Sequence, residues 1–144
     1  MESFVFGGAR HERLEVNVLR YERAASGNNY HDDNWLSVEV SVNCGAFHGK
    51  FPAAFLTGEL ESFYVQLARL YETLTGKARF QTLEGQLELE VIGDGLGHIS
   101  ISGEAQDKAG IGNKLLFKLA VDQTQLQTSV QSLAAVTSAF PVRT

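Results

Sequence analysis

The sequence of 144 residues is poor in cysteine and has no long apolar run. Its only cysteine, Cys44, has no partner for an internal disulfide, which fits a reducing compartment. No uncharged apolar stretch approaches the roughly 18 residues that a membrane-spanning helix needs. The first residues carry charges early and lack the apolar core of a signal peptide. We therefore expect a cytoplasmic protein with no membrane partner.

Sequence patterns for metal and phosphate binding are also missing. The histidines show neither HxH nor HxxxH spacing, and Cys44 is predicted to face inward, so we expect no metal site and no cofactor. The glycine-rich segments 93–97 and 110–114 each precede a predicted strand. A phosphate-binding loop is instead followed directly by a helix. We interpret both segments as hairpin loops.

A nucleophilic catalytic arrangement is not indicated either. His98, Ser100 and Ser102 share the outward face of one predicted strand. Catalytic triads are assembled from separate elements around a strained turn, whereas polar residues at every second position are typical of a solvated strand face. We therefore predict no catalytic residue and no enzymatic activity.

Positive charge is in the minority, with 12 Lys and Arg against 17 Asp and Glu and a formal net charge of −5. Proteins that bind nucleic acid need positive charge to hold the phosphate backbone, so we expect no nucleic-acid partner. The charge is compatible with a basic protein domain as partner, because an acidic surface speeds association with a basic one.

The sequence does contain a strongly amphipathic segment at 57–75. Its apolar residues recur every three or four positions, which places them in one stripe along an α-helix: Leu60, Phe63, Tyr64, Leu67, Leu70, Tyr71 and Leu74. Thr57 is expected to be its N-cap, and Gly76 the glycine that follows its C-terminal end. A second helix is predicted over 123–138, where Asp122 and Gln125 have the spacing of a capping box.

Alternating apolar and polar residues predict strands before and after the helix at 57–75. The clearest runs from Trp35 to Cys44, and Pro52 within the strand 47–55 indicates an edge strand or a bulge. The other predicted strands are 4–6, 14–21, 78–82, 87–91, 99–104 and 115–121. We expect a single α+β domain over residues 1–144, with an antiparallel, strongly curved sheet and both helices on its apolar face.

The two strand–helix junctions align with each other at an offset of 66 positions, which matches Phe51 with Phe117 and Leu67 with Leu133. An internal duplication of the strand–helix unit would explain this alignment. Any two amphipathic strand–helix units would also align in this way, so the sequence leaves both explanations open.

The densest polar cluster belongs to segment 24–34, which is rich in small and polar residues and is predicted to be an exposed loop. Asp and His side chains together could carry acid–base chemistry. The simpler interpretation is that Asp33 or Asn34 begins the next strand through an Asx turn. Trp35 follows, and its position in the alternation places it on the polar face of that strand.

An aromatic side chain beside acidic residues also suits the anchor of a protein interface. The candidate partner-binding residues are therefore Tyr30, His31, Asp32, Asp33 and Trp35. Loop 107–113 is a second candidate surface. Alternatively, Trp35 is covered by Phe140 and Pro141.

Four short motifs resemble those of one known family. They are Asp33-Asn34-Trp35-Leu36, Leu60-Glu61-Ser62-Phe63, the strand Leu87–Val91, and Phe140-Pro141-Val142-Arg143. Together they look like the WapI-like bacterial immunity proteins, over about Trp35 to Arg143 and without residues 1–13. The founding member binds and neutralises the tRNA-cleaving end of a contact-delivered toxin. The resemblance implies a non-enzymatic protein that neutralises a bacterial toxin.

Two other functions remain open. One is binding of a small apolar ligand in a cavity between the curved sheet and helix 57–75. Such a cavity would be lined by Phe47, Phe51, Phe55, Phe63, Tyr64 and Tyr71. The other is a structural subunit that oligomerises through an edge strand; the sequence does not decide between a monomer and a homodimer.

Overall fold

The computed structural model describes residues 2–9 and 12–144, which form the same series of elements twice: four strands followed by a long helix. The first series comprises β1 (Glu2–Ala9), β2 (Glu12–Tyr21), the short helix α1 (Tyr30–Asp33), β3 (Trp35–Cys44), β4 (Phe47–Leu56) and α2 (Thr57–Thr73). The second comprises β5 (Thr75–Phe80), β6 (Leu87–Asp94), β7 (His98–Gln106), β8 (Lys114–Asp122) and α3 (Gln123–Ala139).

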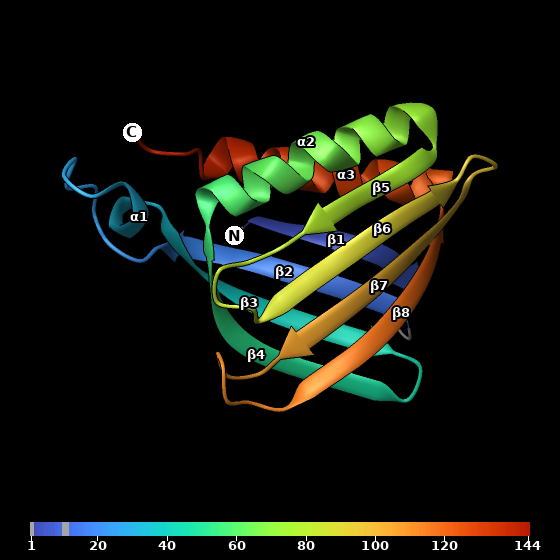
Figure 1. Ribbon diagram of the computed structural model, residues 1–144, viewed down its shortest axis with the longest axis horizontal. Coiled ribbons are helices and arrows are strands. Elements are labelled where there is room, and N and C mark those ends of the chain that lie inside the picture. The colour runs from blue at the N-terminus through green and yellow to red at the C-terminus, as the bar shows by residue number, and fades with distance from the viewer. Residues whose placement is uncertain (1, 10–11) are drawn as a thin grey trace.

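The strands form two four-stranded antiparallel sheets, in the orders β1-β2-β3-β4 and β5-β6-β7-β8. The predicted α+β class and antiparallel pairing are confirmed, although the strands divide into two sheets where one was expected. Figure 1 shows the two long helices side by side, along the side of the molecule where β1 and β5 lie. Each helix packs on the edge strand of the other series, α2 on β5 and α3 on β1.

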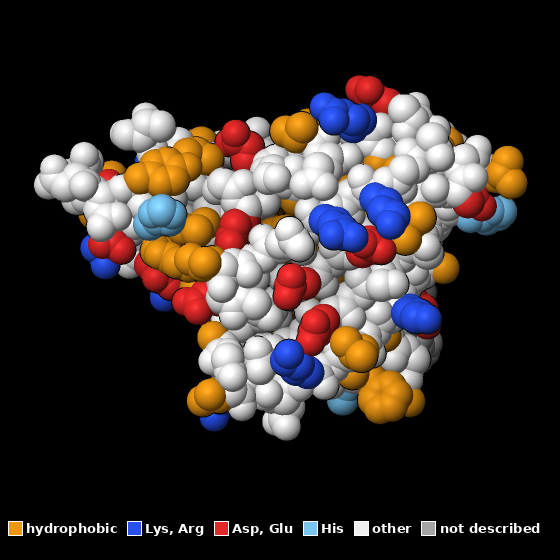
Figure 2. Space-filling view, viewed as in Figure 1, with side chains coloured by type: hydrophobic (Ala, Val, Ile, Leu, Met, Phe, Trp, Pro, Cys, Tyr) orange, Lys and Arg blue, Asp and Glu red, His pale blue; other side chains and the backbone are white. Residues whose placement is uncertain are grey.

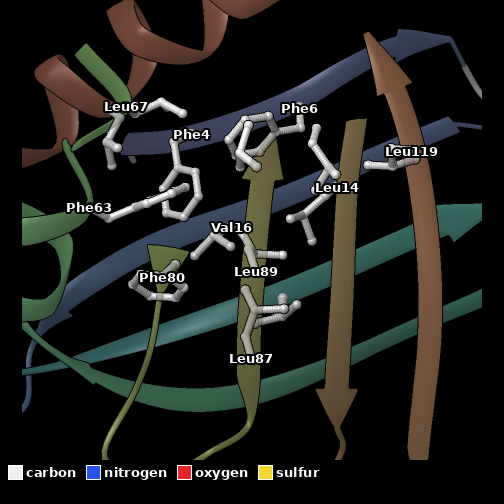
Figure 3. Packing of buried hydrophobic residues seen from close by; sticks show 14 of the residues in the cluster. Phe4, Phe6, Leu14, Val16, Phe63, Leu67, Phe80, Leu87, Leu89 and Leu119 are labelled. Carbon is white, nitrogen blue, oxygen red and sulfur yellow. The ribbon is translucent and has the colours of Figure 1, made fainter. Parts of the chain in front are cut away.

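The core lies between the inner faces of the two sheets and the apolar stripes of the helices. Phe63 of α2 packs against Phe4 of β1 and Phe80 of β5, with ring centroids 6.4 and 5.2 Å apart (Figure 3). Phe55 reaches the same cluster, 5.1 Å from Phe80. Phe55 and Phe63, two of the residues proposed to line a ligand cavity, are fully buried, whereas Phe47, another of them, is 67% exposed.

Edge strand β4 confirms the interpretation of Pro52. Its ladder with β3 continues without a bulge, and Pro52 lies on the edge of the sheet, where a missing N–H is tolerated. The carbonyl of Pro52 accepts a hydrogen bond of 3.2 Å from the buried side chain of Gln86, which directly precedes β6 of the other sheet. This bond covers part of an edge that could otherwise pair with another chain.

The ends of α2 differ from the expectation. Leu56 is the N-cap, its N–H donates to the Glu59 carboxylate at 2.7 Å, and the predicted cap Thr57 is instead the first helical residue. At the other end Leu74 takes the left-handed conformation, with a φ of 61°, and Gly76 belongs to β5. A glycine was expected there because a side chain is strained at positive φ. The capping box between Asp122 and Gln125 at the start of α3 is confirmed.

The offset of 66 residues that aligns the sequence also maps α2 onto α3, since 57–73 becomes 123–139. The repeated order of four strands and a helix therefore favours an internal duplication over a coincidence of two amphipathic patterns. Within the described part of the chain, no helix is long and apolar enough to cross a membrane.

Candidate protein-binding surface

The segment 22–34, called the α1 loop below, joins β2 to β3 and projects beyond the end of the first sheet (Figure 1). Residues 22–31 are all exposed, as predicted. The segment nevertheless has a defined structure, because it contains α1. Asn29 is the N-cap of this short helix, and its side chain accepts a hydrogen bond of 3.1 Å from the backbone of Asp32. The last turn closes with a bond from the N–H of Asn34 to the carbonyl of His31.

Asp33 is buried, and the prediction that it lies exposed is wrong. Only 5% of the residue is accessible, and its carboxylate accepts bonds from the N–H and the hydroxyl of Ser26, both at 2.9 Å, and from the N–H of Gly27 at 2.8 Å. The backbone bond from Ser26 is the largest of the effects that lower the pKa of Asp33. Through these bonds, the buried carboxylate of Asp33 stabilises the folded α1 loop.

Asn34 joins three separate parts of the chain and is 1% exposed. Its amide nitrogen donates to the carbonyls of Tyr30 and Arg143, at 2.7 and 2.8 Å. Its amide oxygen accepts from the hydroxyl of Thr57 and from the N–H of Arg143, both at 2.7 Å. Both donors and both acceptor sites of the amide are used, so Asn34 fixes α1 against the start of α2 and against the segment 140–143.

Arg143 completes this network from the other end of the sequence. Its guanidinium donates to the carbonyl of Asp33, with Nε at 2.8 Å, and to the carbonyl of Arg23 at 2.9 Å. It also lies 3.7 Å above the ring of Tyr21, a cation–π contact. Burial raises the pKa of the Tyr21 phenol, and the nearby positive charge of Arg143 acts in the opposite direction.

The outer side of α1 is open to partners. Tyr30 is 52% exposed and its ring meets that of His31 edge-on at 5.7 Å, while Asp32 pairs with Arg23 at 3.4 Å. Figure 2 shows hydrophobic and histidine side chains gathered at this end of the molecule. A groove of about 410 Å³ runs from α1 to α2 and β5, lined by Tyr30, His31, Asn34, Leu56, Gly58, Glu59, Ser62, Gln66, Arg79 and Gln81.

Trp35 starts β3 and is half-buried on its outer face, the side that its position in the alternation predicted. The ring of Phe140, which the alternative placed over Trp35 together with Pro141, packs edge-on against Tyr21 at 5.5 Å. The structure therefore brings Tyr30, His31 and Asp32 together on α1, and Trp35 follows α1 after one intervening residue, Asn34.

The second candidate surface, loop 107–113, is also exposed and internally bonded. The carboxylate of Asp107 accepts from the N–H of Asn113 at 2.8 Å, and Ile111 is 86% exposed. On the outward face of β7, His98 pairs with Asp94 of the same hairpin at 2.9 Å. Within the described residues, no group of three or more His, Cys, Asp and Glu side chains is placed to hold a metal ion.

Three residues that support α1 were absent from the predicted site: Tyr21, Asn34 and Arg143. Two of them could be singled out from the sequence, because Asn34 and Arg143 belong to motifs 33–36 and 140–143 of the family resemblance. Read separately, neither motif shows that the two residues bond across 109 positions of sequence. No feature of the sequence singled out Tyr21, since it ends an ordinary alternating strand.

An exposed helical turn whose backbone is held by the buried side chains of Asp33 and Asn34 suits a protein-binding module. The chain belongs to the immunity protein WapI-like family, whose sequence model matches residues 5–141. The match extends the resemblance seen from Trp35 onward back into β1. No curated protein matches the chain. Membership assigns the role of an immunity protein in general, and a protein toxin as the kind of partner.

Proposed function

We propose that this protein neutralises a bacterial toxin by direct, non-enzymatic binding through Tyr30, His31, Asp32 and Trp35, called the recognition surface below. The observation that carries this proposal is the structure of α1, which turns Tyr30 and His31 outward while Asp33 and Asn34 hold its backbone from beneath. A surface ordered before binding loses less entropy when it binds. Exposed aromatic side chains next to polar ones are typical anchors of interfaces.

The charge of the chain supports a basic toxin domain as the partner. A domain that cleaves RNA needs positive charge to hold its substrate, and this chain has a formal net charge of −5. Asp32 provides negative charge on the recognition surface, with its side chain 40% exposed. Neutralisation would take place in the cytoplasm, which the unpaired, buried thiol of Cys44 suits.

The test first identifies a toxin gene in the neighbourhood of this gene and then measures binding of its toxin domain to single variants of the recognition surface. Tyr30→Ala should raise the dissociation rate because it removes an anchor. Asp32→Lys should slow association, and the difference from wild type should shrink as salt is added. Glu72→Lys, exposed near the far end of α2, is the control with the same change of charge and should bind as the wild type does.

If Tyr30→Ala and Asp32→Lys both bind as tightly as the wild type, the recognition surface is wrong. The interface would then be sought on loop 107–113 or on the outer face of the second sheet, where Glu88 and Glu90 lie. Should the wild type fail to bind the neighbouring toxin domain, direct neutralisation itself would be contradicted.

A further inference from the structure

The α1 loop is bonded internally through Asp33 and Asn29, but little of it is buried against the rest of the chain. Residues 22–31 are all exposed, and α1 has only four residues, far fewer than an isolated helix needs to be stable in water. The buried anchors of the α1 loop are Asp33 and Asn34. The bonds of the loop to the rest of the chain therefore decide how it is oriented on the molecule.

Most of these bonds come from the segment 140–143. Its residue Arg143 contributes its N–H, its carbonyl and its guanidinium to three residues of the α1 loop, namely Arg23, Asp33 and Asn34. The carbonyl of Asp33 lies at the C-terminal end of α1, where an unpaired backbone carbonyl is best satisfied by a cationic donor. Bonds of this charged kind stabilise more than neutral ones do.

The guanidinium is itself held in position. Tyr21 lies beneath it at 3.7 Å, and the hydroxyl of Tyr21 donates to the carbonyl of Pro141. Phe140 packs against the same ring and follows directly after α3. The segment 140–143 is thereby fixed to the end of β2 by Tyr21, and it reaches the α1 loop from this fixed position.

We infer that Arg143 is a positioning residue for the recognition surface: by bonding to the carbonyls of Arg23 and Asp33, it keeps α1 in the orientation that presents Tyr30 and His31. The effect on binding rests on the proposed function, whereas the effect on the α1 loop can be measured in the free protein. A planar guanidinium is required, because a lysine at this position cannot donate to two carbonyls in the same fork.

The first experiment is amide hydrogen exchange on the free, full-length protein. Arg143→Ala should speed exchange in residues 22–34 by about ten-fold, while the strands β3 and β6 exchange as in the wild type. Arg69→Ala, which removes an exposed arginine from α2, is the matched control and should change nothing in the α1 loop. Unchanged exchange in residues 22–34 of Arg143→Ala would overturn the inference.

If Arg143→Ala exchanges faster throughout the sheets, Arg143→Lys is compared instead. This variant keeps the charge and most of the side chain, so it should loosen residues 22–34 and leave the sheets protected. If residues 22–34 of Arg143→Lys are as protected from exchange as those of the wild type, the planar guanidinium is not needed. This result would also contradict the inference.

The second experiment measures binding of the same variants to the toxin domain. Arg143→Ala should weaken affinity by about ten-fold, because only the fraction of molecules with α1 in place can bind. Faster exchange with unchanged affinity would overturn the positioning role. Weaker affinity with unchanged exchange would indicate a direct contact and overturn it equally. Failure of the wild type to bind would contradict the proposed function alone, because the exchange experiment does not use the partner.

Discussion

Asp32 and Asp33 are neighbours in the sequence with opposite surroundings. The Asp32 side chain is 40% exposed and pairs with Arg23, whereas Asp33 is 5% exposed and accepts bonds from Ser26 and Gly27. An acidic residue that is held by backbone N–H groups organises its own segment, and one that faces solvent is available to a partner. Of the two carboxylates, Asp32 is therefore the one that can contact a toxin.

This difference predicts unequal effects of the same substitution. Asp33→Asn should destabilise the α1 loop, because an amide group cannot accept all of the hydrogen bonds that the carboxylate accepts. Asp32→Asn should change the free energy of unfolding by about 0.5 kcal/mol or less, as exposed substitutions usually do. Hydrogen exchange of residues 22–34 in the two variants measures the difference, and equal exchange would contradict the structural role of Asp33.

The pKa of Asp33 gives a prediction of pH dependence. Since the folded protein lowers this pKa below the ordinary 3.8, the unfolded loop binds the proton more tightly than the folded one. The carboxylate therefore stabilises the loop fully at pH above 3.8 and loses this effect as the pH falls through the folded pKa. The amide proton shifts of Ser26 and Gly27, followed by NMR during acidification, should move below pH 3.8.

Glu59, at the start of α2, titrates in a different range and provides an internal comparison. Burial raises its pKa above the ordinary 4.5, so its protonation begins at a higher pH than that of Asp33. If the amide proton shifts of Ser26 and Gly27 still move below pH 3.8 in an Asp33→Asn variant, another titrating group causes the change.

At the scale of elements, α2 is stabilised by one face only. Leu67 lies in the middle of its apolar stripe and is fully buried, while Val65 on the same helix is 50% exposed. Leu67→Ala should lower the free energy of unfolding by about 2–5 kcal/mol, because it leaves a cavity where the core is densely packed. Val65→Ala is the control and should change it by about 0.5 kcal/mol or less.

Denaturant titrations of the two variants give these differences in free energy directly. A Leu67→Ala protein as stable as the wild type would mean that the stripe of α2 does not face the core. Leu133 of α3 lies at the equivalent place in the second series and is also fully buried, so Leu133→Ala should give a loss of the same order.

At the scale of the whole molecule, each long helix packs on a strand of the other series. This arrangement predicts that the two series unfold cooperatively. Because α2 packs mainly on β5 and α3 mainly on β1, each series covers much of its helix with a strand of the other series. Trp35, the only tryptophan, reports on the first sheet, whereas Leu89 lies in the core of the second. Leu89→Ala should therefore lower the denaturant midpoint seen in Trp35 fluorescence.

The size of that change should equal the one measured by circular dichroism, which reports on all elements together. A Trp35 midpoint that Leu89→Ala leaves unchanged would show that the two series unfold independently. Such a result would also contradict the expectation of a single domain over residues 1–144.

Much of the architecture could be predicted because the hydrophobic periods are local. In the structure, the burial of residues follows the alternation from Leu36 to Cys44 and the helical spacing from Leu60 to Leu74. The structure of the α1 loop could not be predicted in this way. The burial of its residues follows no period. Asp33 is held in its buried position by hydrogen bonds, which the hydrophobicity pattern of the sequence does not reveal.

By itself, the sequence determined the identity of the strands and long helices, the edge position of Pro52, and the family to which the chain belongs. Each of these depends on residues that are close together along the chain. The tertiary structure alone decided that the strands separate into two sheets, that each helix packs on the other series, and that Arg143 reaches Asn34 across 109 positions. The physical reason is that such contacts depend on how distant elements fold together, and no local pattern of residues specifies that arrangement.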